Sequence, residues 1–258
     1  MITDIELRRL SVETGVPVGT VEKDLAITCA LYAISRRGLR DHLAFKGGTA
    51  IKKIYHPGAR FSEDLDFTAI DLEEEEAATQ LESLNDAEIN SITFMETHQD
   101  GQTHRGTRHR LPYIGPLNHP NSIRLDLSFR DDLILPPEER TVQSSFSEDL
   151  TSRVKTLDFT ELMAEKLRAM MTRENPRDYY DAWAHLPRIQ EKWHLKELAQ
   201  RKCALAEYPF NPSRILDQDV LSRIESAWRT QLQHLTPDYV EFQTIIPQLR
   251  DQTRFLFT

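Results

Sequence analysis

A pair of glycines followed by two closely spaced carboxylates is the first candidate for a site that carries out chemistry. Gly47 and Gly48 read as a tight turn entering a helix, and Asp64 and Asp66 follow within an apolar run that predicts a strand over residues 61–67. Asp is depleted from strands, so two in one short strand call for a reason. Because side chains alternate between the faces of a strand, both carboxylates are expected on one face, about 7 Å apart.

This arrangement favours the binding of metals and phosphates. Hard cations such as Mg²⁺ take oxygen ligands, and the spacing suits two metals about 4 Å apart. Ser62 is expected on the same strand face, and a third carboxylate, Asp126, alternates with apolar residues in a strand predicted over 122–129. Backbone N–H groups at the Gly47-Gly48 turn can hold phosphate oxygens. The pattern predicts metal-dependent phosphoryl or nucleotidyl transfer.

Composition limits the classes of protein to which the chain can belong. It has 258 residues, 39% of them hydrophobic and 28% charged, which is enough for one large or two small domains with a sizeable core. Neither a membrane-spanning run nor a signal-like N-terminus is seen, so a cytoplasmic protein without a membrane partner is expected. Cys29 and Cys203 are too few for a disulfide framework.

The net charge of −9 argues against broad, non-specific nucleic-acid binding. The charge is unevenly distributed, however: residues 36–60 are mostly basic, 71–90 are acidic, and Arg105, Arg108 and Arg110 form a second basic cluster. These arginines are expected either to guide RNA phosphates or to be the exposed face of a strand.

The order of elements predicts an α+β fold, with a mixed sheet and flanking helices first and a C-terminal helical lobe second. We place the domains at residues 1–155 and 156–258, because strand patterns end near the prolines at 136–137 and helical patterns dominate from Asp158. Asp158 with Glu161 reads as a capping box, and Asn175 caps a helix with Pro at its first position.

Several local expectations follow from turn and cap signals. Thr49 is expected to cap a helix, and the acidic helix is expected to run to about residue 90. Gly101 is placed in the turn between strands 91–94 and 103–114, and Thr236 with the following Pro is expected to start the last helix.

Two blocks of the sequence together resemble a known family. The first contains Phe-Lys-Gly-Gly-Thr-Ala at 45–50 and Arg-Phe-Ser-Glu-Asp-Leu-Asp-Phe at 60–67. The second contains Glu-Lys-Leu-Arg-Ala at 165–169 and Pro-Arg-Asp-Tyr-Tyr-Asp at 176–181. Over roughly residues 20–240 the chain resembles the AbiEii/AbiGii toxins, which have the polymerase-beta-like nucleotidyltransferase fold. The 15 residues between Gly48 and Asp64 (49–63) exceed the spacing usual in that superfamily.

The resemblance implies an NTP-dependent nucleotidyltransferase toxin of a bacterial toxin–antitoxin system. Its substrate would be a nucleoside triphosphate. The nucleotide would be transferred to RNA, in particular to the 3′ end of tRNA. Its protein partner would be a cognate antitoxin. The resemblance also implies that the enzyme uses Mg²⁺, with two ions expected, and it implies a role for each matching residue. The metal ligands would be Asp64, Asp66 and Asp126; the nucleotide-binding residues Lys46, Gly47, Gly48, Thr49, Ser62 and Lys166; and the catalytic residues the three aspartates with Lys166 and Asp178.

Three charged residues of the second block also have a structural explanation. Lys166 can lie along its helix as a surface lysine, and Asp178 can stabilise the N-terminus of its own helix. Asp181 can pair with Arg177 one helical turn away. At the level of the whole protein, a metal-dependent ribonuclease and a non-catalytic nucleotide-binding regulator remain alternatives.

Overall fold

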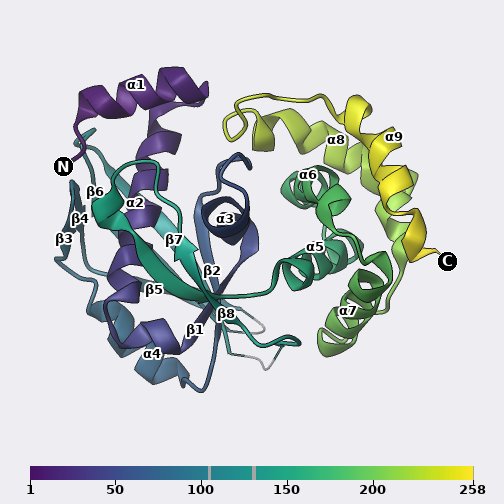
Figure 1. The fold of residues 1–258 in the computed structure, drawn as a ribbon, viewed down its shortest axis with the longest axis horizontal. Coiled ribbons are helices and arrows are strands. Elements are labelled where there is room, and N and C mark those ends of the chain that lie inside the picture. The colour runs from purple at the N-terminus through teal and green to yellow at the C-terminus, as the bar shows by residue number, and fades with distance from the viewer. Residues whose placement is uncertain (104–105, 130–131, 258) are drawn as a thin grey trace. The chain divides into compact units, whose positions relative to one another are not determined.

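A boundary after Leu157 divides the chain into two units, Met1–Leu157 (unit 1) and Asp158–Thr258 (unit 2). The structure is a computed structural model that describes residues 1–103, 106–129 and 132–257. Figure 1 shows that unit 1 holds the strands and unit 2 only helices. The strands-first, helices-second order predicted from the sequence is present.

Unit 1 is built on a mixed sheet. Among the described residues, nine strands pair in the order β3-β4-β6-β7-β2-β1-β9-β8, with β5 added beside β6. β2 runs parallel to β7 and antiparallel to β1, so the two strands that carry the predicted carboxylates are neighbours. The strands are β1 (Leu43–Lys46), β2 (Asp64–Ala69), β3 (Glu88–Ile89), β4 (Ile92–Phe94), β5 (His98–Thr103), β6 (Gly106–Ile114), β7 (Pro120–Ser128), β8 (Glu138–Val142) and β9 (Ser152–Thr156).

The core of unit 1 lies between the sheet and helix α2 (Val18–Ser35), which contacts β4, β7 and β9. Phe45 on β1 and Phe67 on β2 are both buried, with ring centroids 5.2 Å apart. Ile123 and Leu125 of β7 are fully buried, as their alternation predicted. Other helices of unit 1 are α1 (Asp4–Thr14), α3 (Gly47–Ala50) and α4 (Glu74–Glu82).

Unit 2 consists of helices whose apolar stripes face one another. Trp228 on α8 is buried and packs edge-on against Phe242 of α9 at a centroid distance of 5.2 Å. The cap at Asp158 is confirmed, because its side chain accepts from the N–H groups of Thr160 and Glu161. The helices are α5 (Phe159–Thr172), α6 (Pro176–His185), α7 (Lys192–Leu205), α8 (Gln218–Leu232) and α9 (Phe242–Gln252).

Several predicted boundaries are wrong. β2 begins at Asp64 rather than at residue 61, because its pairing with β7 starts there. Gly101 lies inside β5, at an irregularity in the pairing with β6, rather than in a turn. The acidic helix ends at Glu82, and strand β3 then begins at Glu88. His104 and Arg105 lie outside the described residues.

The prolines at 136–137 do not end the sheet, since β8 and β9 follow them. β9 pairs in parallel with β1, and β8 pairs with β9. The last helix starts at Phe242 rather than at Thr236, whose hydroxyl donates to the carbonyl of Leu232 at the end of α8. A Thr-Pro step therefore follows the end of one helix here instead of starting the next.

Candidate active site

The three predicted carboxylates lie on neighbouring strands of unit 1. Asp66 on β2 is in register with Asp126 on β7 and, on its other side, with Lys46 on β1. Arg108 on β6 is in register with Asp126, so one row across four strands reads Lys46, Asp66, Asp126 and Arg108. Asp64 lies two residues before Asp66 on β2, opposite Arg124. Neighbouring strands are about 4.8 Å apart, so two like charges in register require nearby positive charge.

The backbone of Gly47 lies directly beside the side chain of Asp66. Its φ of +78° lies in the left-handed region, and a Cβ added there would be 2.1 Å from Asp66 Oδ2. Only glycine fits both conditions. The carboxylate of Asp66 therefore packs directly on the turn that leads from β1 into α3.

Thr49 connects the same turn to β2. It does not cap α3, because that helix already begins at Gly47 and Thr49 lies buried within it. Its hydroxyl donates to the backbone carbonyl of Asp64. This contact positions the strand relative to the turn, and the role of Thr49 in nucleotide binding stays a prediction.

Ser62 precedes the first residue of β2, so it does not share a strand face with Asp64. Its side chain is nevertheless buried, with 8% of the residue exposed. Lys46 faces a residue that the sequence did not single out: its Nζ lies 3.7 Å from Asp132 Oδ2, and Asp132 Oδ1 accepts from the hydroxyl of Thr68 at 3.2 Å. No local signal marks Asp132, since its place depends on where the chain returns after β7.

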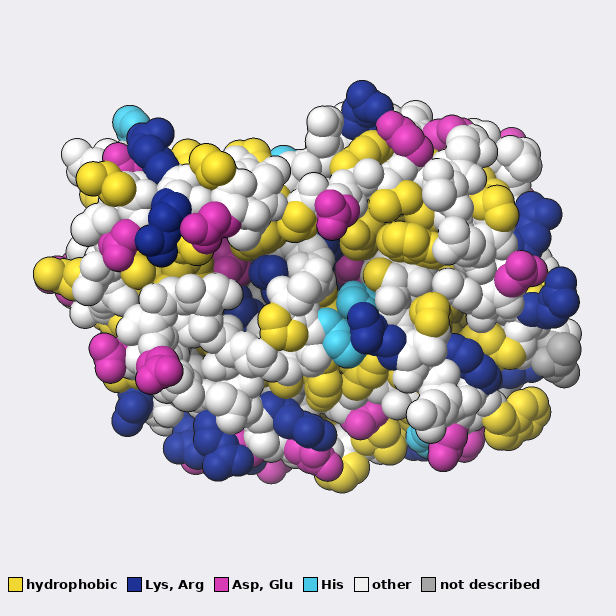
Figure 2. Space-filling view, turned by 45° about the horizontal axis from the view of Figure 1, so that its top comes forward, with side chains coloured by type: hydrophobic (Ala, Val, Ile, Leu, Met, Phe, Trp, Pro, Cys, Tyr) yellow, Lys and Arg dark blue, Asp and Glu magenta, His cyan; other side chains and the backbone are white. Residues whose placement is uncertain are grey.

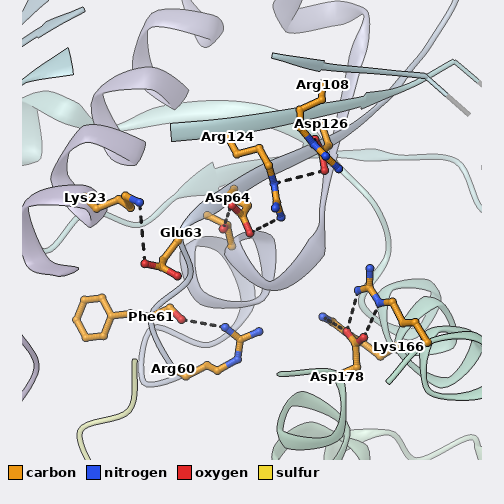
Figure 3. Close-up of polar contacts among 12 residues, drawn as sticks. Lys23, Arg60, Phe61, Glu63, Asp64, Arg108, Arg124, Asp126, Lys166 and Asp178 are labelled. Atoms are coloured by element: carbon orange, nitrogen blue, oxygen red, sulfur yellow. Dashed lines mark hydrogen bonds and ion pairs between the residues drawn. The ribbon is translucent and has the colours of Figure 1, made fainter. Parts of the chain in front are cut away.

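Two arginines hold the carboxylates (Figure 3). Arg124 Nη2 donates to Asp64 Oδ2 at 2.7 Å, and its Nε lies 3.6 Å from Asp126 Oδ2. Arg108 Nε donates to the other oxygen of Asp126 at 2.9 Å. This hydrogen bond raises the pKa of the Arg108 guanidinium above its usual value. Sequence reasoning left Arg124 unused, although it lies two residues before Asp126 on the same strand face.

The described arginines around residue 108 lie on the exposed face of β6, and the residues between them lie on its buried face. Thr107 and His109 are buried, and His109 Nε2 lies 2.9 Å from the Thr107 hydroxyl. Burial lowers the pKa of His109. Arg110 lies on the face of Arg108 but pairs with Asp100 at 2.7 Å. The two described arginines of the cluster therefore form ion pairs on an exposed strand face.

The donor chemistry of the three aspartates suits a divalent cation. Their oxygens are the ligands that hard cations take, and the register brings Asp66 and Asp126 to adjacent positions. Within ranges 1–103, 106–129 and 132–257, no three His, Cys, Asp or Glu side chains are gathered as a metal site. Two of the aspartates are turned toward arginines instead. The backbone arrangement fits a metal, whereas metal binding requires these side chains to change partners.

A second charged cluster lies within unit 2. Lys166 on α5 places its Nζ 2.9 Å from Asp178 Oδ1 and 2.8 Å from Asp181 Oδ2, both on α6. Arg173 Nε lies 2.8 Å from the second oxygen of Asp178. Figure 3 shows the contact between Lys166 and Asp178. Lys166 and Asp178, which the family resemblance named as site residues, are thus in contact, and Asp181 contacts Lys166 as well.

Burial and charge act in opposite directions on Asp178, which is 1% exposed. Burial would raise its pKa, but Lys166 and Arg173 outweigh burial and hold the pKa below its ordinary value. The carboxylate is therefore ionised at neutral pH despite lying in the interior. Lys166 is also buried, so its reading as a surface lysine is wrong.

Comparisons with known proteins bear on the family and the fold of the chain. The model of the nucleotidyl transferase AbiEii toxin family, of type IV toxin–antitoxin systems, matches residues 29–248. MenT4, a nucleotidyltransferase toxin of Mycobacterium tuberculosis, has a similar structure with a TM-score of 0.78 at 19% identity, over 100% of this chain and 90% of MenT4. JHP933 of Helicobacter pylori has a TM-score of 0.58 at 16% identity, over 93% of each chain. No curated protein matches in sequence. The predicted fold class is confirmed.

Proposed function

Since the chain belongs to the family of nucleotidyl transferase AbiEii toxins of type IV toxin–antitoxin systems, we propose that it transfers a nucleotide from a nucleoside triphosphate to RNA. The proposed acceptor is the 3′ end of tRNA, and modification there would block translation. The observation that carries the proposal is the group of three carboxylates on β2 and β7 beside the Gly47 turn. A toxin of this family has a cognate antitoxin as its partner, and we place its action in the cytoplasm.

Asp64, Asp66 and Asp126 would hold Mg²⁺, with two ions expected. Bound there, the metal would neutralise triphosphate charge and lower the pKa of the attacking RNA hydroxyl. The backbone N–H groups of Gly47 and Gly48 would hold phosphate oxygens, because the absence of side chains lets a phosphate approach the turn. Lys46 would add positive charge at this end of β1, and Ser62 is proposed to contact the nucleotide just before β2.

Lys166 is proposed to bind the triphosphate, with Asp178 as the residue that positions its ammonium group. Their separation of 2.9 Å within unit 2 supports this assignment. A buried lysine that bridges two carboxylates is fixed in place, so little freedom would be lost when it binds phosphate. We propose that residues 1–155 carry the metal-dependent chemistry and that residues 156–258 contribute Lys166.

RNA binding would depend on local groups rather than on a broad basic surface. The net charge is −9, and on the face drawn in Figure 2 basic and acidic side chains are interspersed. Recognition of RNA by contacts close to the reacting end is compatible with such a surface, whereas non-specific binding along a duplex is not.

Among the described residues, none of the helices is long and apolar enough to cross a membrane.

The test incubates the protein with total tRNA, Mg²⁺ and each radiolabelled NTP in turn. Wild-type protein is expected to label tRNA with one or more of the four nucleotides, and Asp64→Ala should abolish labelling. Asp100→Ala is the matched control, because Asp100 is an exposed strand carboxylate that pairs with Arg110 instead. RNA shortening without NTP would indicate a ribonuclease. Binding of NTP without either change in RNA would indicate a regulator.

A further inference from the structure

Arg124 and Arg108 carry positive charge into direct contact with two of the proposed metal ligands, Asp64 and Asp126. Arg124 bridges Asp64 and Asp126, at 2.7 and 3.6 Å, and Arg108 takes the remaining oxygen of Asp126 at 2.9 Å. Both come from the central strands β6 and β7, on the same face as the carboxylates (Figure 3). Two of the three predicted ligands thus have guanidinium partners at the positions where a cation would bind.

We propose that Arg124 and Arg108 are exchangeable partners of this site. They hold Asp64 and Asp126 until a divalent cation takes these carboxylates, and they then bind phosphate oxygens of the nucleotide or of the RNA end. The proposal rests on the proposed function, since it assigns two residues to the same reaction. It makes the arginines competitors of the metal and, once displaced, ligands of the substrate.

The exposure of the four side chains supports an exchange. Arg124 and Arg108 are 47% and 41% exposed, so their ion pairs are weakened by water and readily broken. Asp64 and Asp126 are less exposed, at 21% and 27%, and remain fixed by their strands. The carboxylates therefore stay in place while the longer, more exposed arginines are able to move.

Guanidinium chemistry suits both partners. The planar fork of arginine binds carboxylate and phosphate with the same bidentate geometry, so an arginine released from Asp64 needs no new environment to accept a phosphate. A purely structural role predicts something different: arginines that only neutralise a strand face would stabilise the aspartates in every state. Removing such an arginine would then disturb the site and weaken metal binding.

The first arm of the test measures Mn²⁺ binding to the full-length protein by electron paramagnetic resonance and calorimetry. Arg124→Ala is expected to bind Mn²⁺ about threefold more tightly than Arg110→Ala, because an ion pair that competes with the metal has been removed. Arg110→Ala is the matched control. It removes the same charge from the same face of the sheet, but the arginine that it removes pairs with Asp100 and not with a proposed metal ligand. Equal or weaker binding by Arg124→Ala would overturn the proposal.

The second arm measures phosphate binding at saturating Mn²⁺, using non-hydrolysable NTP analogues and tRNA. Arg124→Ala is expected to bind one of them about tenfold more weakly than Arg110→Ala. A loss confined to NTP assigns the arginine to the triphosphate. A loss confined to tRNA, with a salt slope reduced by about one, assigns it to the RNA backbone. No loss of either ligand would overturn the proposal.

Arg124→Lys is a control in case Arg124→Ala does not fold, because lysine keeps the positive charge and loses only the planar guanidinium group. It is expected to bind Mn²⁺ nearly as wild type and phosphate more weakly than wild type. If wild type labels tRNA and Arg124→Ala behaves as Arg110→Ala in both arms, the exchange fails and the proposed function stands. If wild type binds neither Mn²⁺ nor NTP, both fail together.

Discussion

At the scale of single residues, the site depends on positions where one atom more or less changes the geometry. Gly47 accommodates the carboxylate of Asp66 because it has no Cβ. Thr49 ties the turn to β2 through one hydroxyl. These contacts hold the backbone of the proposed phosphate-binding turn against the strand that carries the carboxylates, so the turn and the strand are positioned together.

Substitution of Gly47 tests this arrangement. Gly47→Ala would place a methyl group 2.1 Å from Asp66 Oδ2 and force a left-handed backbone on alanine. We expect the free energy of unfolding to fall by about 1–3 kcal/mol and NTP binding to be lost, because Asp66 has to move. Urea denaturation and nucleotide binding measure the two effects. Gly58→Ala is the control, since nothing lies within 4 Å of its added Cβ. Equal behaviour of the two variants would contradict this account of Gly47.

At the scale of elements, strands and helices place charged groups in pairs. In the row of paired residues across β1, β2, β7 and β6, a lysine is followed by two aspartates and then by an arginine. In unit 2, helices α5 and α6 are joined by Lys166 and its two carboxylates. In both places a charged position on one element acquires its partner from another element.

The lowered pKa of Asp178 gives a pH prediction for the contact between α5 and α6. A carboxylate with a lowered pKa in the folded state stabilises the fold above its unfolded pKa, about 3.9, and loses that contribution as the pH falls through the folded pKa. We therefore expect wild type to lose more stability than Asp178→Asn between about pH 4 and pH 2. Denaturation at several pH values measures the difference. Parallel curves for the two proteins would show that Asp178 is not stabilised as the carboxylate.

At the scale of the whole molecule, two units divide the proposed chemistry. Unit 1 carries the carboxylates and the glycine turn, and unit 2 carries Lys166. Unit 2 also holds Lys202, a second buried lysine, whose Nζ lies 2.6 Å from Glu161 and 3.0 Å from Glu165. The two lysines are alike in burial and pairing, yet only Lys166 lies in a sequence block that resembles a motif of the family.

These two lysines separate a structural from a functional role. Lys166→Gln and Lys202→Gln should each cost on the order of 3 kcal/mol of stability, because each leaves buried carboxylates without their cation. Only Lys166→Gln is expected to abolish nucleotide transfer at a temperature where both variants are folded, while Mn²⁺ binding by unit 1 persists. Circular dichroism, metal titration and tRNA labelling measure the three properties. Equal residual activity in the two variants would show that Lys166 has only a structural role.

The sequence alone determined the features that depend on local periodicity and on residue type. The alternation of β7, the cap at Asp158 and the presence of two carboxylates in one strand follow from spacings of a few residues, and the structure has them all. Because those patterns are local, they also placed Asp64, Asp66, Asp126 and Lys166 on regular elements. The family motifs added the nucleotidyltransferase fold, which the comparisons confirm.

Only the tertiary structure decided which elements pair and which charges meet. The parallel pairing of β9 with β1 was missed, because a short strand after two prolines gains its stability from a partner more than a hundred residues earlier. The contacts of Arg124 with Asp64 and of Lys46 with Asp132 depend on strand order and register. Register is a property of two distant segments packed together, so no spacing within one segment could reveal it.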